Sequence, residues 1–102
     1  MQFSDFSTAA SLDSAGKSEF ITDREKHLIG IAVTATRGCV QCTGGRIKRA
    51  LDSGIEYDAL IAAINLAAAV NAGVTLAIAI QGAEREQISG SCKDASCTTG
   101  VN

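Results

Sequence analysis

The sequence predicts an all-α protein, and three observations support that fold class. Hydrophobic residues make up 46% of the 102 residues, alanine is abundant, and aromatic residues make up only 4%. Alanine is the strongest helix former, whereas strands favour β-branched and aromatic side chains. The chain contains no proline to interrupt helices, and its capping signals and glycines mark helix ends. A chain of this length forms one domain and can bury a core without disulfides.

The first two helices are predicted by an apolar face and by a capping motif. Over residues 1–15, apolar side chains approximate one face of a short helix, which should end at residues 16–18. Thr22 and Glu25 have the Thr-x-x-Glu spacing of a capping box. A second helix should therefore begin there and run to about Arg37.

Glycines delimit the next two helices. Gly38 supplies a break, and a third helix is predicted from residue 39 or 40 to Ser53, closed by Gly54. Acidic residues then open a fourth helix over residues 58–86, with a soft point at Asn71-Ala72-Gly73.

The fourth predicted helix is apolar on every side. Its large apolar residues are Leu60, Ile61, Ile64, Leu66, Val70, Val74, Leu76, Ile78 and Ile80. A helix of this kind must be covered all round, and the other short helices can hardly do this alone. We therefore expect burial against other subunits, the alternative being a small bundle with this helix at its centre.

Charge and segment composition exclude several classes of partner. The net charge is −2 and the pI is about 5.2, with basic residues thinly spread, so we expect neither nucleic acid nor a membrane as partner. The N-terminus lacks the features of a signal peptide, and Asn71 and Gln81 interrupt the apolar stretch. We expect a cytoplasmic protein, in which thiols are mostly reduced.

The chain is expected to divide into a helical domain, residues 1–86, and a flexible tail, residues 87–102. The tail is rich in Ser, Thr, Gly and Asp and contains Cys92 and Cys97. Their spacing is too wide for a usual zinc knuckle. They either pass electrons to the other two cysteines or are incidental.

Cys39 and Cys42 form the main candidate site. Two cysteines three residues apart at a helix start can reach each other and close a disulfide. Free amide groups and the helix dipole stabilise a thiolate at this position. Arg46 follows Cys42 by one helical turn and can place a positive charge near the second sulfur. A buried apolar pair of cysteines, and a surface arginine beside Lys48 and Arg49, are the structural alternatives.

The segment Glu25–Val33, the run Arg37-Gly38-Cys39-Val40-Gln41-Cys42 and the segment Ala50–Ile55 resemble the carboxymuconolactone decarboxylase superfamily. The cysteine pair is similar to that of its alkylhydroperoxidase D-like branch. The resemblance covers roughly residues 20–85. It implies a bundle of helical hairpins, a homo-trimer or homo-hexamer, and reduction of peroxides through the cysteine pair. No cofactor or metal is expected.

Two positions depart from the pattern of that branch. A glutamate usually stands twelve residues before the first cysteine and a histidine four residues after the second, where this chain has His27 and Arg46. Arginine stays protonated and cannot act as a general base. His27 can move protons but meets the cysteines only if the third helix folds back along the second. Glu25 is a candidate to orient His27 or to pair with Arg46, besides its place in the capping box.

Two arguments disagree about which sulfur attacks. Helix electrostatics favours Cys39, whereas the family resemblance implies peroxide attack by Cys42 with Cys39 resolving, and we follow the resemblance. Cys39, which we expect nearer the exposed end, would then exchange with a partner.

The predicted function is that of a thiol–disulfide redox protein, a peroxidase or a disulfide reductase, that cycles Cys39 and Cys42. Its partners would be a hydroperoxide or disulfide substrate and an external dithiol reductant. The alternatives are a protein that binds soft metals through the same thiols, and a non-catalytic oligomeric member of the family that has lost the proton relay.

Overall fold

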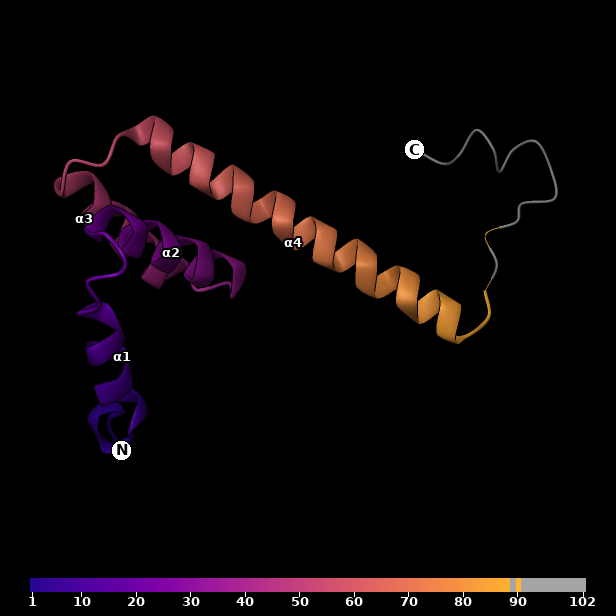
Figure 1. The fold of residues 1–102 in the computed structure, drawn as a ribbon, viewed down its shortest axis with the longest axis horizontal. Coiled ribbons are helices and arrows are strands. Elements are labelled where there is room, and N and C mark those ends of the chain that lie inside the picture. Colours follow the sequence, from indigo (N-terminus) through magenta and orange to yellow (C-terminus); the bar gives the residue numbers. More distant parts are fainter. Residues whose placement is uncertain (89, 91–102) are drawn as a thin grey trace. The chain divides into compact units, whose positions relative to one another are not determined.

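The computed structural model describes residues 1–88 and Gly90, and every regular element in this part of the chain is helical (Figure 1). In order, these elements are a short 3-10 helix η1 (Phe3–Asp5), α1 (Thr8–Gly16), α2 (Asp23–Thr36), α3 (Val40–Asp52) and α4 (Tyr57–Arg85). The predicted all-α fold is thus confirmed. Cys92 and Cys97, with the predictions made for them, lie outside the described residues.

The N-terminal segment forms two short elements where one helix was expected. The Asp5 carboxylate accepts a hydrogen bond of 2.8 Å from the backbone N–H of Gln2 and closes the turn of η1. Phe6 then adopts an extended backbone, which separates η1 from α1. Local bonding by the short aspartate side chain competes with helix hydrogen bonds, which explains the division.

The predicted capping box at the start of α2 is confirmed. The hydroxyl of Thr22 accepts from the Glu25 N–H at 3.1 Å, and the Glu25 carboxylate accepts from the Thr22 N–H at 2.8 Å. The backbone hydrogen bond from Thr22, followed by its side-chain hydrogen bond, lowers the pKa of Glu25 from its ordinary value of 4.5. Both bonds favour the charged carboxylate.

We expect Glu25→Gln to reduce the free energy of unfolding at neutral pH and to have little effect in acid. Because the folded state lowers this pKa, the contribution of Glu25 is complete above the unfolded pKa and disappears as the pH falls through the folded one. Urea unfolding followed by circular dichroism, from pH 7 to pH 3, measures the difference. Glu19→Gln, at an exposed position outside the helices, is the control. A difference between wild type and Glu25→Gln that does not change with pH would contradict this assignment.

Glycines end α2 and α3 in the same way. After α2, Gly38 has a φ of 85°, its N–H donates to the Ala35 carbonyl, and the Cys39 N–H donates to the Thr34 carbonyl. These two bonds form a Schellman motif, which requires a left-handed residue and so favours glycine. Gly54, with a φ of 96°, ends α3 by the same pattern of bonds. Both predicted glycine breaks are therefore confirmed.

The turn at Gly38 folds α3 back along α2, so the two helices form a packed hairpin. The small core comprises Ile31 of α2, Ala50 of α3, Ile55 and Leu60. Partly buried apolar residues pack around it: Leu28, Ile47, Ala59 and Ile64. All of them belong to the first of two units into which the chain divides, Met1–Ala69, and the second begins at Val70.

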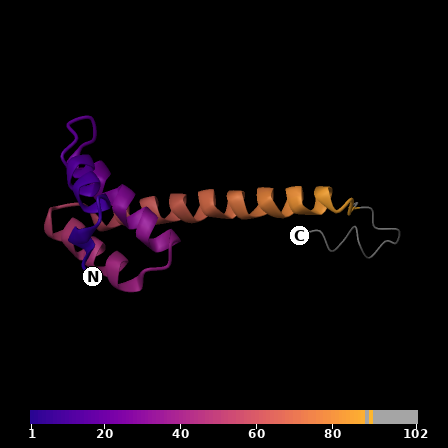
Figure 2. The ribbon, with the colours of Figure 1, turned by 90° about the horizontal axis from the view of Figure 1, so that it is seen from below.

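Helix α4 is unbroken from Tyr57 to Arg85 and continues through residues 71–73, where a soft point was predicted (Figure 2). One glycine inside a helix costs only about 1 kcal/mol, and the many alanines and leucines around it offset that cost. The hydroxyl of Thr75 also bonds to the carbonyl of Asn71 within the helix, at 2.9 Å.

Most of α4 is uncovered in the single chain. Leu60 is its one buried residue. Between 57% and 66% of the surface of each of six large apolar residues is exposed: Leu66, Val70, Val74, Leu76, Ile78 and Ile80. By length and composition alone, α4 is also apolar enough to cross a membrane, a test that the core helix of a soluble protein also passes.

Candidate functional site

Cys39 connects α2 to α3 and is the N-cap residue of α3. Its backbone N–H completes the Schellman motif of α2, and its sulfur accepts a hydrogen bond of 3.2 Å from the Cys42 N–H. The two cysteines form a disulfide, with their Cα atoms 5.3 Å apart. The predicted proximity of the two cysteines is confirmed, and their position follows from the two helix ends that meet here.

The environment of Cys39 favours a negatively charged sulfur. An N-cap side chain receives a backbone N–H that has no partner within the helix, and it lies at the positive end of the helix dipole. In the reduced protein, a Cys39 thiolate at this position would accept the same Cys42 N–H. This hydrogen bond makes Cys39 a good leaving group when the disulfide is attacked.

The exposures of the two cysteines are the reverse of the expected ones. Cys42 is exposed, whereas Cys39 is half-buried. The N-cap position turns the Cys39 sulfur toward the helix end, while Cys42, in the first turn of α3, lies on its outer surface. Neither cysteine is buried, which argues against a purely apolar packing role.

Two threonines that the sequence analysis did not single out fix the turn beside the cysteines. The hydroxyls of Thr34 and Thr43 lie 3.0 Å apart, one on α2 and one on α3. The Thr43 hydroxyl is also 2.7 Å from the Cys39 carbonyl oxygen, and Thr34 donates to the Gly30 carbonyl. Thr43 follows Cys39 by one helical turn. In the sequence, this spacing was the only sign that the Thr43 hydroxyl would contact the Cys39 carbonyl.

His27 lies near the other end of the hairpin. Its Nε2 is 3.4 Å from the hydroxyl oxygen of Ser53, the residue that follows α3. The Ser53 hydroxyl donates its proton to the Ala50 carbonyl at 2.8 Å, so it can only accept from a protonated Nε2. Ser53 lies roughly 16 Å along the helix axis from Cys42. The fold-back at Gly38 is therefore present, but it pairs His27 with the end of α3 rather than with the cysteines.

The Arg46 side chain crosses from α3 to α2 at Gly30. A Cβ atom at position 30 would meet the guanidinium Nη1 and would lie 2.9 Å from its Cζ. A glycine at this position therefore allows Arg46 to lie against the backbone of α2. Within the described residues, Arg46 makes no ion pair, and no hydrogen bond joins it to Cys42.

The Glu25 carboxylate is engaged in the capping box of α2. No ion pair joins it to Arg46 in the part of the chain that is described. Its observed contacts are those of a helix cap.

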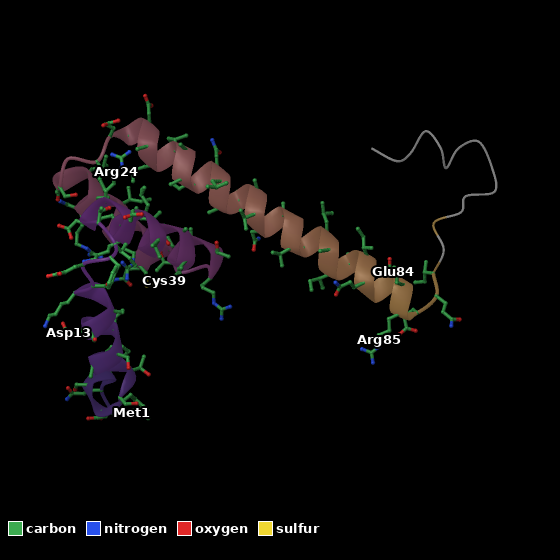
Figure 3. All side chains as sticks on the ribbon, in the orientation of Figure 1. Met1, Asp13, Arg24, Cys39, Glu84 and Arg85 are labelled. Carbon is green, nitrogen blue, oxygen red and sulfur yellow. A yellow bond between two sulfur atoms is a disulfide. The ribbon has the colours of Figure 1, made fainter. Side chains whose placement is uncertain are left out.

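An open cavity of about 600 Å³ lies beside the start of α2 and the end of α3. His27 and Arg46 both line it, whereas Cys39 and Cys42 do not. Figure 3 labels Arg24, which lines this cavity, and Cys39, which lies at the turn. The structure thus brings together two of the predicted site residues and separates them from the two cysteines.

The surface next to Cys42 is open. A Cβ atom at Gly44 would meet no other atom within 4 Å, and one at Gly45 would meet only the Arg49 side chain, at 3.4 Å. These two glycines therefore leave open space on α3 beside the exposed Cys42. Among the described residues, no three His, Cys, Asp or Glu side chains gather to hold a metal ion.

Comparison with known protein families identifies a family that matches most of this chain. The model of the carboxymuconolactone decarboxylase family matches residues 10–85, which covers most of the chain and all of α2, α3 and α4. No curated protein and no solved structure matches the chain.

Proposed function

The chain belongs to the carboxymuconolactone decarboxylase family, and from this premise we propose that it is a thiol–disulfide oxidoreductase that cycles Cys39 and Cys42. The observation that carries the proposal is the disulfide at the start of α3, in which Cys39 is both the N-cap and the acceptor of the Cys42 N–H. The alkylhydroperoxidase D-like branch, in which such a pair is expected, agrees with this family.

In the oxidative half of the proposed cycle, a hydroperoxide accepts two electrons from the cysteine pair. The Cys42 thiolate attacks one peroxide oxygen, the O–O bond breaks, and the other oxygen leaves as an alcohol after taking up a proton. The Cys39 thiolate then attacks the Cys42 sulfur of the sulfenic acid. The disulfide forms, and the hydroxyl group leaves as water with a second proton.

In the reductive half, an external dithiol restores the two thiols. We assign its attack to the Cys42 sulfur because Cys42 is exposed and Cys39 is half-buried. Cys39 leaves as a thiolate, which the Cys42 N–H and the helix end stabilise. The second thiol of the reductant then breaks the mixed disulfide and becomes oxidised itself. In this proposal the reductant exchanges with Cys42. The sequence analysis had expected this exchange at Cys39.

Disulfide exchange is a better match to this site than rapid peroxide turnover. Arg46 stays protonated, so it can stabilise an anion but cannot take a proton from Cys42. His27 bonds to Ser53, and protons can reach it from the cysteines only through other groups or water. We infer that a disulfide substrate is reduced faster than a hydroperoxide.

Arg46 and His27 also support a second candidate function, that of a non-catalytic oligomer that kept the fold and lost the proton relay. In that case the Cys39–Cys42 disulfide would be a static link within the first turn of α3.

Thiol titration and disulfide mapping test the proposal. We expect two fewer titratable thiols per chain after mild hydroperoxide treatment, with Cys39 and Cys42 joined in the mapped peptide. A dithiol reductant should restore both thiols, and repeated cycles should consume peroxide in proportion to the reductant. Thiols that survive a mild peroxide excess, together with a disulfide that dithiols do not reduce, would establish the non-catalytic alternative.

A further inference from the structure

The cavity at the open end of the α2–α3 hairpin is strongly basic. Four cationic side chains line it: Arg24, Lys26, Arg46 and Arg49. One carboxylate, Asp23, accompanies them, and it lies 3.8 Å from the Lys26 ammonium group. Because the whole chain has a net charge of −2, this positive charge is a local concentration and not a general property of the surface.

Three of these cations have no carboxylate at ion-pair distance among the described residues. Arg24, Arg46 and Arg49 form no ion pair within the described part of the chain. Lys48, which lies between Arg46 and Arg49 in sequence, is paired with Asp52 at 2.9 Å and does not line the cavity. Arg24, Arg46 and Arg49 therefore line the same cavity, whereas Lys48 lies outside it.

The backbone and the neutral polar groups also suit an anion. Gly30 leaves room for the Arg46 guanidinium against α2. At the cavity wall, His27 lies beside Ser53. The three arginines supply the charged donors, since guanidinium groups bind oxoanions with two parallel hydrogen bonds.

We propose that this cavity binds a small organic molecule through a dianionic oxoanion group, a phosphate or a pair of carboxylates. Its volume of about 600 Å³ lies within the range of small-molecule pockets and leaves room for an organic body beside the charged group. The ligand position is separate from the disulfide, because neither Cys39 nor Cys42 lines the cavity. Binding therefore does not depend on the redox proposal.

Titration of the oxidised, full-length protein, followed by NMR of its backbone amides, tests this site without turnover. Inorganic phosphate and succinate are the two probes, used in separate titrations at constant low ionic strength, and they distinguish the two sources of negative charge. We expect saturable shifts of the amides of His27, Arg46, Arg49 and Ser53 with at least one probe. Shifts at Lys48 and Cys42 should be smaller.

Two variants with the same change of charge complete the experiment. Arg49→Gln should weaken binding about tenfold or more, because it removes charged hydrogen bonds to the ligand. Lys48→Gln should change affinity by less than about threefold, because it alters only the general field. Equal weakening by the two variants, shifts centred outside the cavity, or no saturation with either probe would each overturn the proposal.

Discussion

Cys42→Ser is expected to abolish both hydroperoxide consumption and exchange with a dithiol, whereas Cys39→Ser should abolish turnover but keep the first step. Cys42 is the exposed sulfur and the proposed point of attack in both half-reactions. Without it, the half-buried Cys39 has no sulfenic acid to resolve and little access to a partner. Without Cys39, Cys42 still reacts with peroxide but stops as a sulfenic acid or as a mixed disulfide.

Mass spectrometry of the two single variants separates these outcomes. After one equivalent of hydroperoxide and a sulfenic acid trap, Cys39→Ser should carry the trap on Cys42, and Cys42→Ser should carry almost none on Cys39. With an excess of a small disulfide, Cys39→Ser should form a stable mixed disulfide several times faster than Cys42→Ser does. Ser53→Ala, at the other end of the hairpin, should react like the wild type.

The opposite order of reactivity would contradict this assignment. If Cys42→Ser were trapped or formed the mixed disulfide faster, the stabilisation of the Cys39 thiolate by the helix end would outweigh access to solvent. Cys39 would then be the attacking sulfur, as helix electrostatics alone suggested.

Local signals predicted the fold of residues 20–60 well. The capping box at Thr22 and Glu25 and the glycines at 38 and 54 act through hydrogen bonds between residues close in sequence, so the sequence displays them directly. The same signals placed Cys39 at the start of a helix, whereas the hairpin was an implication of the family resemblance. The nearly continuous helix expected over residues 58–86 is confirmed as α4, in which the surrounding helix formers outweigh the weak position at Gly73.

The site was predicted less completely, because its geometry depends on how α3 is rotated against α2. That rotation decides that Cys42 is exposed, that Arg46 lies over Gly30 and that His27 meets Ser53. Helical spacing placed Arg46 on the same face as Cys42 but did not show that its side chain extends toward α2. The basic cavity depends on residues from both helices of the hairpin, and no short motif marks it.

The apolar surface of helix α4 is expected to determine how copies of the chain assemble. Its exposed apolar residues lie on every side, and Figure 3 shows their side chains along the helix. We propose that copies of the chain cover this surface in a homo-trimer or homo-hexamer. Full burial of each large side chain contributes about 1.5–3 kcal/mol, so several residues per chain supply a strong driving force.

Leu76→Asp should therefore dissociate the oligomer, because it would place an unpaired carboxylate in an apolar interface at a cost of several kcal/mol. Gln81→Asp, which adds the same charge in the same helix at a polar position, should reduce assembly much less. Analytical ultracentrifugation in detergent-free buffer measures both variants, and the wild type should sediment as a trimer or hexamer. A wild-type monomer in that buffer would contradict the assembly. A chain that stays with membranes until detergent is added would instead show that lipid covers α4, since its length and composition also permit that.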